Sequence, residues 1–169
     1  MRFHAAHIDN LRKFYVDQIE HLHSAEVQIA EALPKMIEAA SDLELKRALQ
    51  NHLQQTREHV SRIEQILRET TARLEPKKNK PIAALIDEAE DIMGDAKNDS
   101  VMDAGIIAAA QRVEHYEIAS YGAVHNYARI LGETSQAGLL EQTLEEEKKA
   151  NATLTGISDS ANVRADKAA

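Results

Sequence analysis

Acidic and histidine side chains fall on the apolar faces of this sequence, where a charged group is costly to bury. Glu26 lies four residues after Leu22 and three before Ile29, so helical spacing places all three on one face. A buried, ionised carboxylate is unfavourable unless it is paired, protonated or bound to a metal ion. The same reasoning selects these candidate metal ligands: Glu26, His52, His59, Glu114, Glu117 and Glu147.

These residues are also spaced so that they can meet. We predict a turn at Ser41, and Glu26 precedes it by the same sequence distance at which Thr56 follows it. Around a second predicted turn near residue 133, Glu117 and Glu147 stand at nearly equal sequence distances on either side. Two antiparallel hairpins would therefore place these side chains at one level near the middle of a bundle, which is the layout of a dinuclear carboxylate site.

The motifs that usually complete such a site are each missing one ligand. In the usual layout two helices each provide a Glu, and the other two each provide Glu-x-x-His. Here one motif is Thr56-x-x-His59 and the other is Glu147-x-x-Ala150. The pattern therefore also allows a mononuclear or asymmetric site, or a buried hydrogen-bond network that joins the histidines to Tyr121. The chain has no Cys, and carboxylate and imidazole ligands favour iron, manganese or zinc.

The elements that must position these residues are helices. Helix-favouring residue types dominate, whereas the 169 residues include six Gly and three Pro, and no alternation is long enough to indicate a strand. We predict an all-α, antiparallel four-helix bundle over residues 1–157 and a flexible tail over residues 158–169. Apolar periodicity places the long helices at about 8–40, 42–74, 101–131 and 135–157, with a short crossover helix at about 82–93. The long connection lets the third long helix run parallel to the second.

Local signals indicate where the helices begin and end. Ser41 with Glu44, and Ser100 with Asp103, have the spacing of capping boxes. Gly132 suits the position just after a helix end. Pro34 lies within the first predicted helix, where it would kink the helix or end its regular part.

Composition limits the partners and the compartment. The net charge of −8 at pH 7 argues against nucleic acid as the main partner, because phosphate binding needs a concentrated basic surface. No segment is apolar over the length of a membrane span, and the first residues form no apolar signal sequence. We therefore expect a cytoplasmic protein with neither a membrane nor a nucleic-acid partner.

Four segments resemble a known family: SAE at 24–26, ALPKM at 32–36, AAAQRVEHYEIASYG at 108–122 and LEEEK at 144–148. They resemble the YciF-type bacterial stress proteins, a branch of the ferritin-like superfamily, and the resemblance extends to about Ile157. It implies a ferritin-like bundle with an extra short helix in the crossover, and a homodimer. It also implies a di-iron or related site at Glu26, Glu114, Glu117 and Glu147, with contributions near His52 and His59. Family members commonly carry Glu where this chain has Gln54 and Gln55.

Three functional hypotheses follow. The first is metal-dependent redox chemistry, in which a carboxylate-bridged pair of iron or manganese ions reduces peroxide or oxidises ferrous iron; zinc is a further metal that the ligands accept. The second is a non-enzymatic, dimeric stress or interaction scaffold whose inward carboxylates are protonated or hydrogen-bonded, and the incomplete Glu-x-x-His motifs favour it. The third is iron storage in a cage, although the chain shows no obvious fifth C-terminal helix. The sequence leaves open whether the protein is an enzyme.

Overall fold

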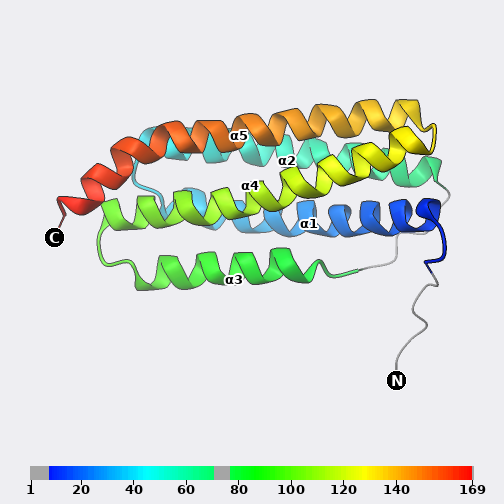
Figure 1. Cartoon of the computed structure of the whole chain (residues 1–169). Coiled ribbons are helices and arrows are strands. Elements are labelled where there is room, and N and C mark those ends of the chain that lie inside the picture. Colours follow the sequence, from blue (N-terminus) through cyan, green and yellow to red (C-terminus); the bar gives the residue numbers. More distant parts are fainter. Residues whose placement is uncertain (1–7, 71–76, 169) are drawn as a thin grey trace, which may run out of the picture.

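Five helices and no strand make up the parts of the chain that the computed structural model describes, residues 8–70 and 77–168 (Figure 1). The helices are α1 (Leu11–Ala39), α2 (Leu43–Glu69), α3 (Lys80–Asp95), α4 (Asp99–Ile130) and α5 (Thr134–Asp166). The predicted all-α bundle is therefore confirmed. None of these helices combines the length and the hydropathy that a membrane span requires.

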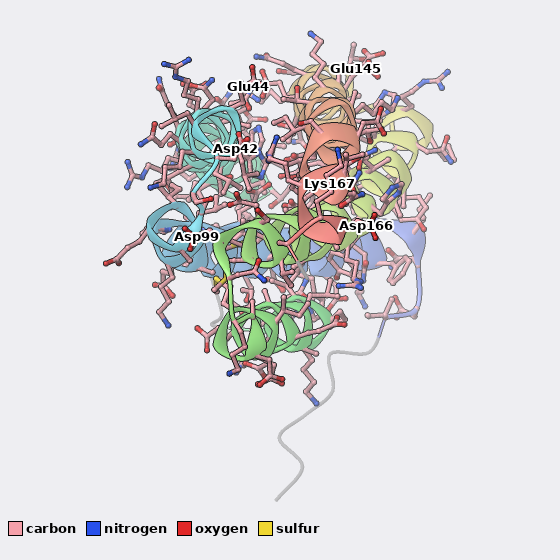
Figure 2. The ribbon with its side chains drawn as sticks, turned by 90° about the vertical axis from the view of Figure 1, so that its left-hand side faces the viewer. Asp42, Glu44, Asp99, Glu145, Asp166 and Lys167 are labelled. Carbon is pink, nitrogen blue, oxygen red and sulfur yellow. The ribbon has the colours of Figure 1, made fainter. Side chains whose placement is uncertain are left out.

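The four long helices form two antiparallel hairpins, α1 with α2 and α4 with α5 (Figure 1). Between them the chain crosses back along the bundle through α3, so that α4 runs parallel to α2. Helix α1 packs beside α4, α2 packs beside α5, and α3 lies outside the bundle against α1 and α4 (Figure 2). This is the single-crossover, ferritin-like arrangement that the sequence predicts.

Asn79 fixes the crossover onto the bundle. Its side chain is buried, and its Oδ1 accepts a hydrogen bond of 3.0 Å from the backbone N–H of Ile82, which caps α3. Its Nδ2 donates to the backbone carbonyl of His21 at 3.1 Å and to the hydroxyl of Tyr116 at 2.9 Å. One amide side chain thus joins α1, α3 and α4, which holds the short helix in place against the bundle.

Both predicted capping boxes are wrong about the capping residue. Asp42, rather than Ser41, caps α2, and its carboxylate accepts two N–H groups of the first turn. Asn98, rather than Ser100, caps α4. In each case the N-cap is an Asp or Asn with extended backbone, and its side-chain oxygen accepts hydrogen bonds from the free N–H groups of the first turn. By contrast, Gly132 has a φ of 77°, as expected for a glycine that follows a helix end.

Asp103, which we predicted to be part of a capping box, instead ties α4 to the turn between α1 and α2. It is 2% exposed, and its carboxylate accepts hydrogen bonds from the backbone N–H of Ser41 at 2.7 Å, from the Ser41 hydroxyl at 2.6 Å and from the backbone N–H of Asp42 at 3.0 Å. Hydrogen bonds to a buried charged group are among the stronger ones in proteins. This contact therefore fixes one hairpin relative to the other.

We expect Asp103→Ala to lower the free energy of unfolding by about 3 kcal/mol, because it removes a buried carboxylate that accepts three hydrogen bonds from the turn between α1 and α2. Urea unfolding of the metal-free protein, followed by circular dichroism, measures the loss. Asp91→Ala is the matched control, because Asp91 is an exposed helical aspartate. A loss for Asp103→Ala no larger than that of the control would contradict the stabilising role.

The C-terminal helix is longer than the sequence predicts. Helix α5 ends at Asp166 rather than near residue 157, so the predicted flexible tail is helical over most of its length. Ala161 is fully buried, and Arg164 Nη2 forms an ion pair of 2.6 Å with Asp42 Oδ2 at the start of α2. The small, polar residues of this segment look like a fraying end in sequence, but one small side chain per turn is sufficient to pack against a neighbouring helix.

The start of the first helix also differs from the prediction. Helix α1 begins at Leu11 after its cap Asn10 rather than at Ile8, and it continues through Pro34 to Ala39. The predicted end of the second helix near residue 74 lies outside the described residues. These shifts leave the mid-bundle level of the polar residues unchanged.

Candidate metal centre

The apolar core is divided into two clusters along the bundle, and polar residues lie between them. One cluster surrounds Ile29, Leu45 and Ile107, and the other surrounds Tyr15, Ile63 and Leu140. The side chains at the intervening level are all at most 6% exposed, and they include every predicted ligand: Glu26, His52, His59, Glu114, Glu117 and Glu147. The hairpin spacing in the sequence therefore predicted the correct level.

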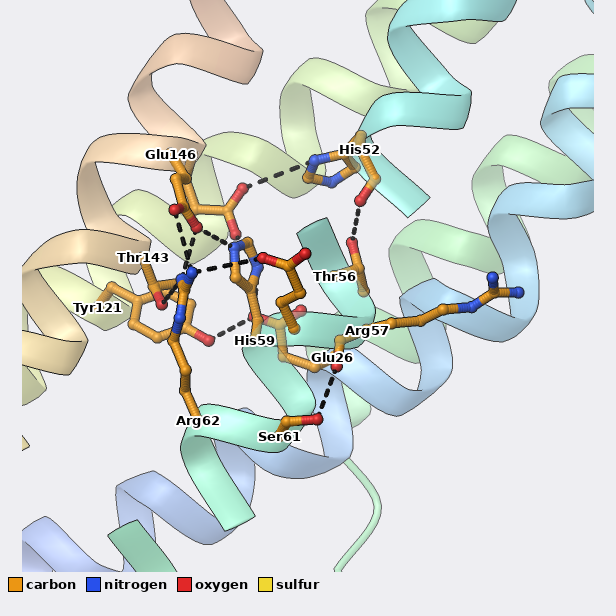
Figure 3. Close-up of polar contacts among 12 residues, drawn as sticks. Glu26, His52, Thr56, Arg57, His59, Ser61, Arg62, Tyr121, Thr143 and Glu146 are labelled. Atoms are coloured by element: carbon orange, nitrogen blue, oxygen red, sulfur yellow. Dashed lines mark hydrogen bonds and ion pairs between the residues drawn. The ribbon is translucent and has the colours of Figure 1, made fainter. Parts of the chain in front are cut away.

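Four helices contribute to this level. Helix α1 provides one carboxylate, α2 provides both histidines, α4 provides two carboxylates at i and i+3, and α5 provides one carboxylate. Figure 3 shows part of this layer, with Glu26, His52 and His59 directed toward the same space. Helix α3 contributes none of these residues, so its role at the site is limited to covering α1 and α4.

The ligand atoms fall into two overlapping groups. His52, Glu114, Glu117 and Glu147 can bring one ligand atom each to within 4.8 Å of the others, and so can Glu26, His59 and Glu147. Bonds of about 2.0–2.2 Å from nitrogen or oxygen to a metal ion place ligand atoms within about 4.5 Å of one another. Each group is therefore within a few tenths of an ångström of the spread that a single ion requires, and Glu147 belongs to both.

Each histidine is in contact with carboxylates of the same layer. His52 Nε2 lies 3.2 Å from Glu114 Oε1, and its Nδ1 lies 3.9 Å from Glu147 Oε2. His59 Nδ1 lies 2.9 Å from Glu147 Oε1 and 3.4 Å from Glu26 Oε1. Both histidines therefore approach Glu147: His59 lies beside its Oε1, and His52 lies nearest its Oε2.

Several carboxylate oxygens in the layer have no hydrogen-bond partner among the described residues. These are Glu26 Oε2, Glu114 Oε2, both oxygens of Glu117 and both oxygens of Glu147, whose contacts with the histidines are ion pairs. A buried polar atom without a partner is uncommon and costly in a folded protein. A divalent cation would satisfy these oxygens, and the donor set of carboxylates and imidazoles fits iron, manganese or zinc.

Without a cation, the pKa values of the layer's ionisable groups are shifted in different directions. Burial, reinforced by the charge of Glu147, raises the pKa of Glu114 and of Glu117 well above the ordinary value. Burial alone would lower the pKa of His59, but its contacts with Glu147 and Glu26 raise it to about 11. Burial would also raise the pKa of Glu147, but the hydrogen bond and charge of His59 lower it. Without metal, the charged pair at the centre is therefore the His59 imidazolium with the Glu147 carboxylate.

A second layer of contacts around His59 escaped the sequence analysis. Glu146 Oε2 lies 2.8 Å from His59 Nε2, and the Arg62 guanidinium donates to both oxygens of Glu146, at 2.6 Å and 3.1 Å (Figure 3). Burial alone would raise the pKa of Glu146, but the hydrogen bonds from Arg62 and His59 lower it to about 2. The LEEEK run offered one signal, because Glu146 precedes a core glutamate and lies near the apolar stripe. Arg62, three residues after His59, offered another.

Thr56 and Tyr121 support the layer from either side. Thr56 stands where the usual motif has a glutamate, and its hydroxyl donates to the backbone carbonyl of His52 at 2.9 Å. The Tyr121 hydroxyl donates to Glu26, and burial raises the pKa of Tyr121 well above its ordinary value. The alternative that we predicted, a hydrogen-bond network from the histidines to Tyr121, is not seen among the described residues, because the Tyr121 hydroxyl bonds to Glu26 instead. The rings of Tyr121 and His59 lie edge to face, with their centroids 6.3 Å apart.

Comparison with known proteins places the whole bundle in one group. The family described as "Domain of unknown function (DUF892)" matches residues 10–166. Protein YciF of Escherichia coli (strain K12) is 40% identical over 145 residues, which cover 85% of this chain and 87% of that protein. The crystal structure of the E. coli stress protein YciF has a TM-score of 0.87 and 35% identity, and covers 91% of this chain and 98% of that chain. YcfI of Rhodopseudomonas palustris has a TM-score of 0.86 and 35% identity, with 90% and 98% covered.

Proposed function

We propose that this chain, which belongs to the DUF892 family, is a stress-associated ferritin-like protein whose core binds two metal ions. The observation that carries the proposal is the overlap of two ligand groups at Glu147. One ion would be held by Glu26, His59 and Glu147, and the other by His52, Glu114, Glu117 and Glu147. Glu147 would then bridge the two ions, and His52 would stand in for the glutamate that Thr56 replaces.

Charge balance supports two ions rather than one. The layer contains four carboxylates, Glu26, Glu114, Glu117 and Glu147, and two divalent cations would neutralise them when all are ionised. The Glu146 carboxylate is balanced separately by Arg62. Bound iron or manganese would supply redox chemistry, either for the reduction of peroxide by an external reductant or for the oxidation of ferrous iron by peroxide or oxygen. Zinc is a further metal that these ligands accept.

The residues around the ligands have positioning roles in this proposal. Tyr121 donates to Oε1 of Glu26, the oxygen that also approaches His59, and so fixes the orientation of this carboxylate. Glu146 accepts from His59 Nε2, which directs Nδ1 toward Glu147 and Glu26; an outer carboxylate commonly orients a metal-binding histidine in this way. The apolar clusters on both sides limit the access of water along the bundle axis.

We expect Glu146→Gln to weaken metal binding by about 10- to 100-fold, the usual effect of losing an outer-shell partner. The amide would still accept a hydrogen bond, but it loses the charge that favours the correct orientation of His59. Competition with a chelator of known affinity measures the change. Glu145→Gln is the matched control, because Glu145 is exposed and pairs with Lys148. Equal affinities for the two variants would show that Glu146 does not act on the site.

Elemental analysis tests the proposal most directly. Protein purified without chelator, from cells supplied with iron and manganese, should contain about two metal ions per chain. Treatment with a chelator followed by titration with each metal should restore the same stoichiometry. Protein that contains no iron, manganese or zinc, and takes up none on titration, would contradict the proposal.

Metal binding should release protons, and its apparent affinity should rise with pH. His59, with a pKa of about 11 in the metal-free protein, must lose its proton before Nδ1 can bind a cation. Glu114 and Glu117, whose pKa values are raised well above the ordinary value, must lose theirs as well. Since protons compete with metal, lowering the pH favours the metal-free state. Calorimetric titration in buffers of different ionisation enthalpy measures the protons released, and an absence of release at neutral pH would contradict this assignment.

A non-enzymatic scaffold is the second candidate. The raised pKa values of Glu114 and Glu117 allow the layer to persist with protonated carboxyls, and the R. palustris relative is described as a candidate structural protein. This alternative predicts that the melting temperature is unchanged by any of the three metals. A native state that binds metal would instead gain stability with the logarithm of the metal concentration above the dissociation constant.

The expected assembly is a homodimer, and the expected partners are metal ions. Neither a membrane nor nucleic acid belongs to this proposal, and the chain is expected to act in the cytoplasm. Light scattering after size-exclusion chromatography checks the assembly. Elution as a 12-mer or 24-mer would favour iron storage in a cage over the proposed function, because storage needs an enclosed volume.

A further inference from the structure

A cavity of about 210 Å³ lies between α2 and α5 and reaches the candidate metal centre. Its inner end is lined by His52 and Glu114, which are buried. Its outer part is lined by Asn51, Lys149 and Thr153, which are exposed. The cavity therefore connects the surface of the protein with one of the two groups of ligand atoms.

Ala150 stands at the place where this cavity passes α5. It follows Glu117 at the same sequence distance at which His59 follows Glu26. The two hairpins therefore place Ala150 where the first hairpin has its histidine. A methyl group in place of an imidazole leaves space beside the second ligand group, and Ala150 lines the cavity.

A second cavity also reaches His52 and Glu114, but it is small and apolar. It lies among α1, α3 and α4, and its volume is about 30 Å³. A volume of this size holds about one or two water molecules, and a buried water needs two to four polar partners. The cavity beside Ala150 has space for several water-sized molecules, and it offers polar groups along its length.

We propose that the cavity between α2 and α5 is the entrance by which a small polar molecule reaches the metal centre, and that Ala150 keeps it open. The inference rests on the proposed function. The residues that line the route include three whose side chains carry hydrogen-bond donors, namely Asn51, Gln55 and Lys149. Such a route suits peroxide or a small anion of two or three atoms.

The test uses the full chain, loaded with iron, oxidised to the ferric form and mixed rapidly with azide. Azide bound to ferric iron absorbs visible light, so its arrival is followed directly and without any catalytic assay. We expect Ala150→Leu to slow the appearance of this absorption by about tenfold or more, because a close-packed interior transmits small molecules poorly. The iron content should equal that of the unsubstituted protein. Ala152→Leu, the same change at an exposed position of α5, should leave the rate unchanged.

Thr153→Leu is a second obstructing variant, which keeps the test usable if Ala150→Leu does not fold. Thr153 is exposed at the mouth of the cavity, so the substitution disturbs no core packing, and it should also slow the binding of azide. Equal azide rates in the obstructed variants and the control, with iron bound, would overturn the entrance and leave the metal site standing. Iron-loaded protein that shows no azide absorption would overturn it as well. Protein that binds no iron would remove both the proposed function and the entrance.

Discussion

Replacing Glu147 with glutamine is expected to remove both metal ions at once. Glu147 contributes an oxygen to each ligand group, and it lies within 3.9 Å of both candidate histidines. An amide oxygen is a weaker ligand than a carboxylate and cannot balance the charge of two cations. We therefore expect the metal content of Glu147→Gln to fall from about two per chain to near zero, as measured by elemental analysis after dialysis against excess metal.

Two variants with the same chemistry at residues of single groups provide the comparison. Glu26→Gln and Glu114→Gln each alter one of the groups, so each should retain about one ion per chain. Circular dichroism should show that all three variants keep the helical fold, since glutamine has nearly the volume of glutamate. If Glu147→Gln lost no more metal than the other two, Glu147 would not be a shared ligand, and two independent sites or one mononuclear site would replace the dinuclear arrangement.

The candidate site could be predicted from the sequence because helix geometry is regular over long distances. Glu26, His59 and Glu147 lie on apolar stripes whose phase persists for many turns, and an error of one or two residues at a helix end does not change which face a mid-helix residue occupies. The wrong helix start at Ile8 therefore had no effect on the site. The same argument places Glu114 and Glu117 in the core together, because residues three apart share a face.

Features that depend on contacts between distant segments could not be predicted in this way. Asp103 has the spacing of a local capping residue, but its partners Ser41 and Asp42 belong to the turn between α1 and α2, far away in sequence. The pairing of Arg62 with Glu146 likewise joins α2 to α5. Charged residues on the border of an apolar stripe point either to solvent or across to the next helix, and the neighbouring helix decides which.

Replacing Glu117 with methionine is expected to stabilise the metal-free protein and to reduce its stabilisation by metal. Glu117 is fully buried, and both of its oxygens lack hydrogen-bond partners among the described residues. Methionine has a similar volume and no polar atom that needs a partner, so the substitution should raise the free energy of unfolding of the metal-free protein by about 2 kcal/mol. Urea unfolding in the presence of chelator measures this gain.

Added metal should stabilise the unsubstituted protein and Glu117→Met to different extents. Saturating metal should stabilise the unsubstituted protein, because it binds the native state and not the unfolded chain. The same addition should stabilise Glu117→Met much less, because one ligand group has lost a carboxylate. Glu141→Met, at an exposed position of α5, controls for the general effect of exchanging a glutamate for methionine. A loss of stability in metal-free Glu117→Met would mean that this carboxyl already has a favourable partner in the core. The last outcome is that metal-free Glu117→Met is more stable while metal does not stabilise the unsubstituted protein. The buried carboxylates would then belong to a scaffold without metal, since no cation offsets the energetic cost of burying them.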